Sequence, residues 1–297
     1  MSNIWKNTGW FVEPTDAREV ISAIGAIGVH SKIQQFAWRG LSSSSFPLTS
    51  HLHRYIDGPE TEMRREEEAL LESAREWGIG VHPTGYSDDL QLLAELQHYG
   101  IATRLIDVTS NPLTALWFAC QDGGPGGNRD GVLLALNITD WQRYNSTGAF
   151  DPTWEDVGSE YSGRLREALR SERPFVVRAD VPNDRIRAQE GYFVASSTPQ
   201  PMSNVSDARI HTDPFRSLQV PFNRGPQDRL SQILLESTDA THDMQMPFVA
   251  VIIKHTLKRR ILRSLEGSFN RTARVLFPDV GGFLEYGDHA RARQRAH

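Results

Sequence analysis

Cysteine is nearly absent from this sequence: Cys120 is the one cysteine among 297 residues. A single cysteine excludes an internal disulfide framework and favours a reducing compartment. Because Cys120 lies within an apolar run, we interpret it as a small buried hydrophobic residue rather than a nucleophile. A chain of this length buries enough apolar surface to fold without disulfides or metals.

Long apolar runs are also missing. No stretch approaches the ~18 residues that a membrane-spanning helix needs, and the N-terminus lacks the basic and apolar regions of a secretory signal. We therefore predict a cytoplasmic protein that has no membrane partner. The formal net charge of -5 does not indicate strong non-specific binding to nucleic acid. The basic run at residues 288–297 is a local exception, which we interpret as a solvated tail.

Several signatures of catalysis are absent. The sequence contains no glycine-rich phosphate loop, nucleophile elbow or HExxH motif. His51 and His53 form too short and isolated a pair to indicate zinc, and the glycines of residues 123–127 are typical of a flexible turn. We therefore predict no metal site.

Hydrophobic periodicity and capping residues predict helices and strands along the chain. Helices are expected at residues 14–29, 59–77, 87–96 (with Ser87 as the cap), 112–122, 163–169 and 256–265. Strands are expected at residues 33–40, 131–138, 174–179, 191–196, 231–237 and 247–255. Helices dominate the first half and strands the second. This pattern predicts an α+β fold in a single domain, residues 1–297, with a core of about 33–285.

A long polar, proline-rich segment runs from Ser197 to Arg229. Structureless loops longer than ~12–15 residues are uncommon in compact domains and are usually functional or mobile. We interpret the segment as a substrate or partner loop, with a mobile insertion as the alternative.

Polar residues are concentrated directly before the apolar helix that starts at Asn111-Pro112. They are His98, Tyr99, Thr103, Arg104, Asp107, Thr109 and Ser110. A buried, unpaired guanidinium is costly, so Arg104 is expected either to form a structural network with Asp107 or to line a ligand cleft. In the second case, amides at the N-terminus of the helix are available to an anion.

Two further places combine a strand end with polar residues. Arg39 ends a predicted strand and precedes Gly40, which suits an anion clamp if the glycine lets a ligand approach the backbone. A surface salt bridge is the alternative. Gln189 and Glu190 directly precede the strand predicted at residues 191–196, where they lie either at a ligand or in solvent.

These pieces together resemble the FRG domain family. The matching elements are Trp38-Arg39-Gly40, the stretch LQHYGIATRLIDVTSNPLTALWFAC, RIRAQEGYF at Arg185–Phe193, and LFPDVGGF at Leu276–Phe283. The resemblance runs from about Ala37 to Phe283. Trp38 stands where the family has phenylalanine, and Ala102 where proline is usual.

The order of these elements is similar to that of ADP-ribosyltransferases. By this analogy the fold has a mixed, split β-sheet flanked by helices in the N-terminal half. Arg39 would hold the phosphates or ribose of NAD, Thr109 and Ser110 would support the nicotinamide ribose, and Glu190 or Gln189 would bond the ribose 2′-hydroxyl. The rest of the cleft would come from Gly40, His98, Tyr99, Arg104, Asp107 and Asn111.

The resemblance implies an NAD-dependent ADP-ribosyltransferase that acts as a bacterial toxin or anti-phage effector. Its acceptor would be RNA, DNA or protein, and an antitoxin or regulatory partner would hold it silent. The residue types suit the chemistry, because a carboxylate stabilises an oxocarbenium-like transition state and an arginine binds pyrophosphate. Two other hypotheses remain: a non-catalytic module that binds a nucleotide or phage component, and a metal-independent nuclease that uses His98 with Arg104.

Overall fold

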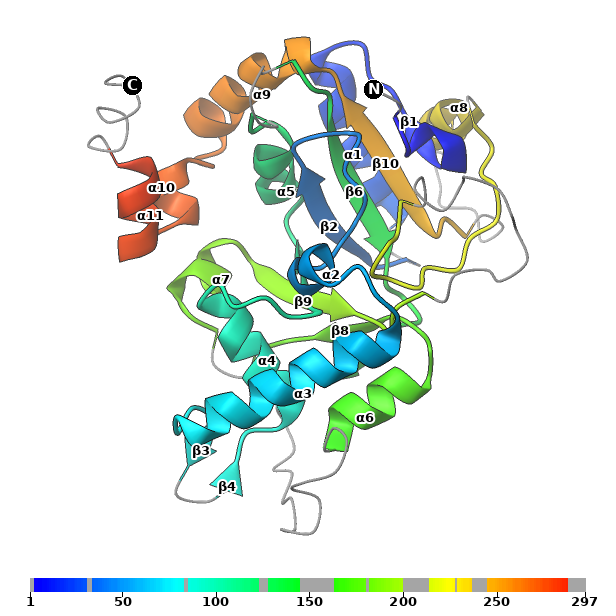
Figure 1. Ribbon diagram of the computed structural model, residues 1–297. Coiled ribbons are helices and arrows are strands. Elements are labelled where there is room, and N and C mark those ends of the chain that lie inside the picture. Colours follow the sequence, from blue (N-terminus) through cyan, green and yellow to red (C-terminus); the bar gives the residue numbers. More distant parts are fainter. Residues whose placement is uncertain are drawn as a thin grey trace.

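The computed structural model describes residues 3–30, 34–82, 85–122, 128–144, 163–179, 182–199, 214–227, 229–236 and 245–287. Its centre is an eight-stranded mixed sheet in the order β1-β10-β6-β2-β5-β9-β8-β7 (Figure 1), and β3 and β4 form a separate two-stranded sheet. The strands are β1 Phe11–Val12, β2 Phe36–Leu41, β3 Val81–His82, β4 Gly85–Tyr86, β5 Ile106–Thr109, β6 Gly131–Asn137, β7 Gln142–Tyr144, β8 Phe175–Val177, β9 Gly191–Ala195 and β10 Phe248–Ile253.

The large sheet is nearly divided in the middle. β2 pairs with β6 along its whole length, and β5 pairs with β9 along its whole length. Between β2 and β5, however, one pair of residues is in register, Trp38 with Thr109. The sheet therefore consists of two halves, β1-β10-β6-β2 and β5-β9-β8-β7, which diverge on either side of this pair.

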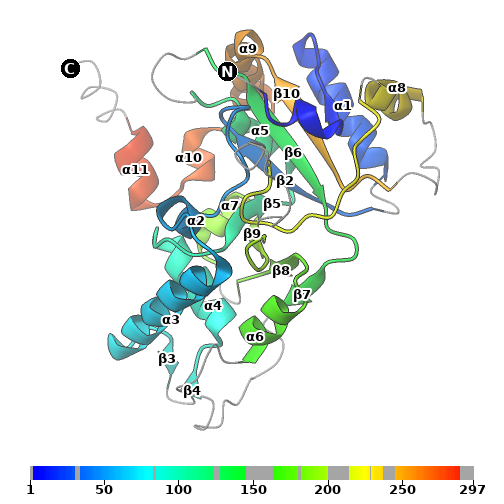
Figure 2. The same cartoon turned by 45° about the vertical axis from the view of Figure 1, so that its right-hand side comes forward.

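Helices cover both halves (Figures 1 and 2). α5 packs on β2 and β6, α1 contacts β10 and α8, and α4 contacts α3 and α6. The helices are α1 Ala17–Val29, α2 His51–Tyr55, α3 Glu60–Glu76, α4 Asp89–His98, α5 Pro112–Ala119, α6 Gly163–Arg170, α7 Asp184–Ala188, α8 Arg229–Glu236, α9 His255–Ser268, α10 Ala273–Leu276 and α11 Val280–Tyr286, with a 3-10 turn at Lys6–Thr8.

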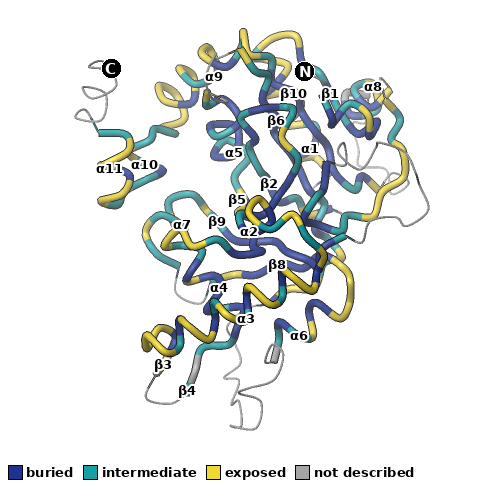
Figure 3. Tube along the Cα trace, in the orientation of Figure 1, coloured by how far each residue is buried: buried dark blue, intermediate teal, exposed yellow. Residues whose placement is uncertain are grey.

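The buried apolar residues form two clusters. One surrounds β10, β6, β2 and α5, and the other lies between α3, α4, α6 and the strands β8 and β9. The first reaches beyond the half-sheet β1-β10-β6-β2, because it also contains Ile106 and Val108 of β5, Val176 of β8, and Tyr192 and Val194 of β9. Figure 3 shows the buried strands inside and the exposed faces of α3 and α9 outside. Strands β6 and β10 are apolar at nearly every position because both their faces are covered.

Local signals in the sequence explain why α5 begins where it does. The Asn111 side chain accepts hydrogen bonds from the amides of Leu113 and Thr114, and Pro112 occupies the first helical position. This is the favoured order of N-cap and first-turn residues. Because Asn111 already occupies these amides, they are not available to an anion, contrary to one of our expectations for this helix.

Most predicted elements are present in the described residues, but three predictions were wrong. Residues 231–237 were expected as a strand, whereas Arg229–Glu236 forms α8 and buries Leu230 and Leu234, which lie one helical turn apart. Ser87 does not cap α4: the N-cap is Asp88. Strands also do not predominate in the second half, since β1 to β7 all precede residue 145. The mixed α and β composition itself is confirmed.

The proline-rich segment is partly integrated into the core. Phe215 lies 4.8 Å from the ring of Phe248 and 5.5 Å from that of Trp5, and Leu218 is fully buried. Within residues 214–227 the alternative of a mobile insertion is therefore wrong, because aromatic packing holds this segment in place. The interpretation as a substrate or partner loop stays a prediction. Residues 200–213, and the basic tail at 288–297, lie outside the described residues.

No helix among the described residues is both long and apolar enough to cross a membrane.

Candidate functional site

A cleft of about 360 Å³ lies at the division of the sheet, between β2, β5 and β9. A volume of this order lies within the range of small-molecule sites. Its walls come from both halves of the sheet and from α4, α5 and α7. The lining residues are Trp38, Arg39, Gly40, His51, Gln97, His98, Gly100, Asp107, Val108, Thr109, Thr114, Ala115, Phe118, Arg185, Ile186, Gln189, Gly191, Tyr192, Phe193 and Phe277.

An arginine and a carboxylate face each other across the division. Arg39 Nη1 on β2 donates to the carbonyl oxygen of Asp107 at 2.5 Å and lies 3.3 Å from its Oδ2 on β5. Gln97 Nε2 approaches the same Oδ2 at 3.4 Å. The side chain of Asp107 is 59% exposed, whereas Arg39 Nε is buried and has no partner among the described residues. The pair thus presents an exposed carboxylate and a partly exposed guanidinium at the cleft.

The turn before β9 is bound tightly to the end of β5. Thr109 Oγ1 donates to the carbonyl oxygen of Gln189 at 2.6 Å, and the Ser110 amide donates to that of Glu190 at 3.1 Å. Glu190 has a φ of 51°, which is uncommon for a residue with a side chain. Its Oε1 accepts from Asn111 Nδ2 at 2.8 Å and Arg271 Nη2 at 3.1 Å. Glu190 is therefore held by its neighbours and is not among the residues lining the cleft.

Two sequence elements that are far apart along the chain meet at one wall of the cleft. Arg185 on α7 forms a two-point ion pair with Asp279, at 2.8 and 2.9 Å, and stacks 5.1 Å from the ring centre of Phe277. Gln189 Nε2 donates to the carbonyl oxygen of Leu276 at 3.0 Å. This contact explains why RIRAQEGYF and LFPDVGGF belong to the same site, although neither contains an obvious catalytic signature.

Two histidines from different helices line the cleft, His51 on α2 and His98 at the end of α4. Burial lowers the pKa of His98, and the charge of Arg185 lowers it further, while Asp279 and Glu95 act in the opposite direction. The net shift favours the neutral imidazole at neutral pH, in which one ring nitrogen accepts a proton. Sequence reasoning missed His51, because His51 and His53 were considered only as metal ligands.

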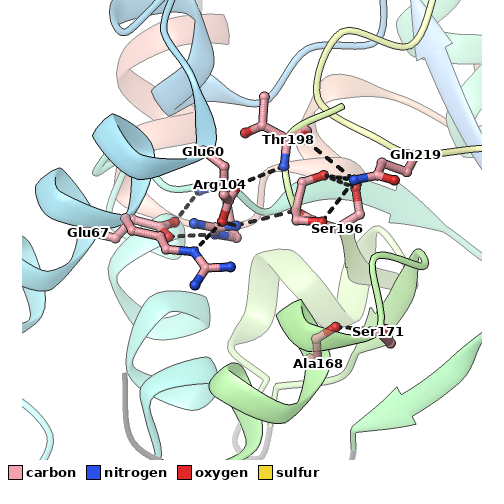
Figure 4. Close-up of polar contacts among 10 residues, drawn as sticks. Glu60, Glu67, Arg104, Ala168, Ser171, Ser196, Thr198 and Gln219 are labelled. Atoms are coloured by element: carbon pink, nitrogen blue, oxygen red, sulfur yellow. Dashed lines mark hydrogen bonds and ion pairs between the residues drawn. The ribbon is translucent and has the colours of Figure 1, made fainter. Parts of the chain in front are cut away.

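Arg104 lies elsewhere, in a buried ionic cluster (Figure 4). Its Nε donates to Glu67 Oε2 at 2.5 Å and its Nη1 to Glu60 Oε1 at 3.0 Å. Glu60 also accepts from the amide of Thr198 at 2.6 Å. Burial alone would raise the pKa of Glu60, but Arg104 and these hydrogen bonds hold it below its usual value.

Both expectations for Arg104 were therefore wrong. It forms ion pairs with Glu60 and Glu67 on α3 rather than with Asp107, and it is not among the residues that line the cleft. These partners lie 44 and 37 residues away, so the local sequence around Arg104 contained no signal for them.

The structure brings six of the expected site residues to the cleft: Arg39, Gly40, His98, Asp107, Thr109 and Gln189. The other five are outside its lining: Tyr99, Arg104, Ser110, Asn111 and Glu190. The main residues that sequence reasoning missed are His51, Gln97, Arg185 and Phe277.

Gly40 has a different reason for being glycine than the one expected. A Cβ at this position would lie 2.0 Å from the carbonyl oxygen of Ala115 and 2.6 Å from the amide nitrogen of Ala119. The glycine therefore allows α5 to approach β2, and close ligand approach is not needed to explain it.

Comparison with known proteins assigns part of the chain. The family model of the FRG domain matches residues 34–125. This range contains β2, α3, α4, β5 and α5. The match confirms the resemblance to the FRG domain that was expected from Trp38-Arg39-Gly40 and from the stretch that ends at Cys120. The elements at 185–193 and 276–283 lie outside the matched range. No curated protein and no solved structure matches the chain.

Proposed function

We propose that the cleft binds NAD and that the protein transfers ADP-ribose from it to a macromolecular acceptor, as a toxin or anti-phage effector does. One observation carries this proposal: the division of the sheet brings a guanidinium, Arg39, and an accessible carboxylate, Asp107, together in one cleft with aromatic walls. Arginine binds phosphate oxygens strongly. The aromatic rings of Phe118 and Phe277 provide apolar surface for a nicotinamide ring.

The reaction breaks the bond between nicotinamide and ribose. Positive charge develops on the ribose as nicotinamide leaves, and a fixed carboxylate stabilises it. The acceptor then attacks the ribose carbon. Neutral His98 is positioned at the cleft to accept the proton that the acceptor releases.

Two carboxylates compete for the charge-stabilising role. Glu190 is the residue that the family analogy favours, but Asn111 and Arg271 hold its carboxylate. Asp107 is the one carboxylate among the described residues lining the cleft. We therefore assign charge stabilisation to Asp107, and Glu190 to positioning of the Gln189–Gly191 turn.

The first test is nicotinamide release from NAD by the purified protein, in the presence of cell extract. We expect Arg39→Ala and Asp107→Asn each to reduce the rate by about 100-fold or more, the size of effect seen when one electrostatic group is removed from an active site. Glu190→Gln should retain more activity than Asp107→Asn. Arg18→Ala is the control, because Arg18 is exposed on α1.

The acceptor is identified in the same reactions by following labelled ADP-ribose into RNA, DNA and protein fractions. Growth arrest on expression of the wild type, relieved by Arg39→Ala, would support a toxin. Wild-type protein that binds NAD but never releases nicotinamide contradicts the proposal and favours a non-catalytic binding module. A greater loss in Glu190→Gln than in Asp107→Asn would return the role to Glu190.

A metal-independent nuclease is a second candidate, because His51 and His98 line the same cleft with Arg39 and Arg185. Two histidines supply a general base and a general acid, and the arginines bind a phosphodiester. The partner of His98 in this hypothesis becomes His51, since Arg104 is buried elsewhere. Cleavage of RNA in the presence of a chelator, lost in both His51→Ala and His98→Ala while NAD stays intact, would establish this alternative.

A further inference from the structure

We propose that Tyr55 and Tyr99 form a stacking rim for the unpaired bases of a single-stranded nucleic acid, and that this strand is the acceptor. Both side chains are 73% exposed, so their ring faces are accessible to a ligand. The assignment as acceptor rests on the proposed function. The stacking surface itself does not, since a nuclease would use it equally.

Each tyrosine ring contacts a histidine that lines the cleft. The Tyr55 and His51 rings lie 5.3 Å apart, and the tyrosine hydroxyl is 3.4 Å from His51 Nε2. The Tyr99 and His98 rings lie 4.9 Å apart. The tyrosines therefore flank the cleft, one on α2 and the other directly after α4. In Figures 1 and 2, α2 lies at the border between the two halves of the sheet.

The charges beside this rim suit a phosphate backbone. Arg54 adjoins Tyr55 in α2, and partial burial and the charge of Arg39 lower its pKa while Asp107 raises it. Arg54 and Arg39 are thus close enough to interact, and together they carry one more positive charge than Asp107, the carboxylate that pairs with Arg39, neutralises. Aromatic rings combined with a cationic groove are the usual means of binding single strands without sequence preference.

A duplex is a poorer fit for the same surface. Its bases are already stacked and paired, so exposed tyrosines have no free base face to contact. A protein acceptor would gain from aromatic anchors at the interface, but these work best in a fully desolvated apolar centre. Here each ring lies beside a polar histidine.

The experiment measures binding of short fluorescein-labelled strands by fluorescence anisotropy, without NAD. The probes are a mixed-sequence single-stranded DNA, a 2′-O-methyl RNA of the same sequence, which resists cleavage that needs the 2′-hydroxyl, and the DNA as a duplex. We expect both single strands to bind more tightly than the duplex. Tyr55→Ala and Tyr99→Ala should each weaken single-strand binding roughly five-fold or more, the loss expected for one base–aromatic stack.

Matched variants separate stacking from other causes. Tyr55→Phe and Tyr99→Phe keep the ring, so they should bind like the wild type. Trp77→Ala serves as the control for an exposed aromatic residue elsewhere, because Trp77 is 83% exposed at the end of α3 that leads to β3. Equal binding by wild type and both alanine variants, or a preference for the duplex, would overturn the proposal.

These experiments distinguish failure of the stacking rim from failure of the proposed NAD reaction. If nicotinamide release is absent but the tyrosines govern strand binding, the stacking rim stands and the NAD reaction fails. If the alanine variants instead raise the KM for NAD and leave strand binding unchanged, the tyrosines belong to the NAD site and the rim is refuted. Label that appears only in protein would refute the nucleic-acid acceptor.

Discussion

At the scale of the residue, Asp88 is a carboxyl group whose surroundings oppose its charge. It precedes α4, and its Oδ2 is shielded from solvent and has no hydrogen-bond partner among the described residues. Burial raises its pKa to about 6, Asp89 adds to the rise, and the amide and charge of Arg164 act against it. The folded protein therefore holds this proton more tightly than the unfolded chain does.

This shift predicts a pH-dependent gain from Asp88→Asn. A raised pKa means that the folded state is penalised once the pH passes from the unfolded value, near 4, through about 6. Asparagine mimics the neutral acid, so the variant should be more stable by about 1–3 kcal/mol near pH 7 and nearly unchanged near pH 4. Urea denaturation at both pH values measures the difference.

Asp184→Asn provides the control for removal of an exposed carboxylate, since its side chain is 82% exposed. An Asp88→Asn protein that is equally or less stable than the wild type near pH 7 would contradict the prediction. In that case the carboxylate has a partner that outweighs its burial.

At the scale of the element, the close packing of α5 on β2 positions the cleft. Gly40 allows this approach, because a Cβ there would meet the backbone of Ala115 and Ala119. Arg39, the preceding residue, points from the same strand toward Asp107. The Arg39-Gly40 pair thus places a residue of the cleft directly beside a residue that allows α5 to pack on β2.

Gly40→Ala should consequently destabilise the protein by about 1–3 kcal/mol or more, the usual cost of forcing atoms into a filled core. Gly25→Ala in α1 is the matched control: no atom lies within 4 Å of the added Cβ, and alanine is favoured over glycine in a helix by ~1 kcal/mol. Chemical denaturation of both variants measures these changes in the free energy of unfolding. Equal stability of the two would show that α5 moves aside at no cost.

At the scale of the whole molecule, the two halves of the sheet share one residue pair. The buried apolar residues form two clusters, of which the one around β10 and β6 also covers one face of β5, β8 and β9. Structures open locally in cooperative units that follow such divisions. The division also creates the cleft, so function and local stability depend on the same feature.

Cavity-forming variants should reveal the two units. Leu93→Ala removes a fully buried side chain from the cluster beside β8 and β9, and Leu134→Ala removes one from the cluster around β6 and β10. Each should cost about 2–5 kcal/mol. Native-state hydrogen exchange should then show the greater loss of amide protection in the half that carries the substitution. Equal loss in both halves after either change would mean that the molecule opens as one unit.

The sequence by itself determined the elements with local signals: the Asn111-Pro112 start of α5, the apolar runs of β6 and β10, and the amphipathic α3. It also placed Arg39 and Asp107 in the site, through the pattern that matches the FRG domain. These features depend on neighbours a few residues apart, so periodicity and capping encode them.

The tertiary structure decided the rest, because the deciding contacts join residues distant along the chain. Arg104 pairs with Glu67 across 37 residues and Arg185 with Asp279 across 94, and no local pattern specifies such partners. The segment that forms α8 was predicted as a strand. A short apolar run is compatible with either a strand or a helix, and the surrounding tertiary structure selects between them. The cleft itself exists only because β2 and β5 meet at a single pair and then diverge.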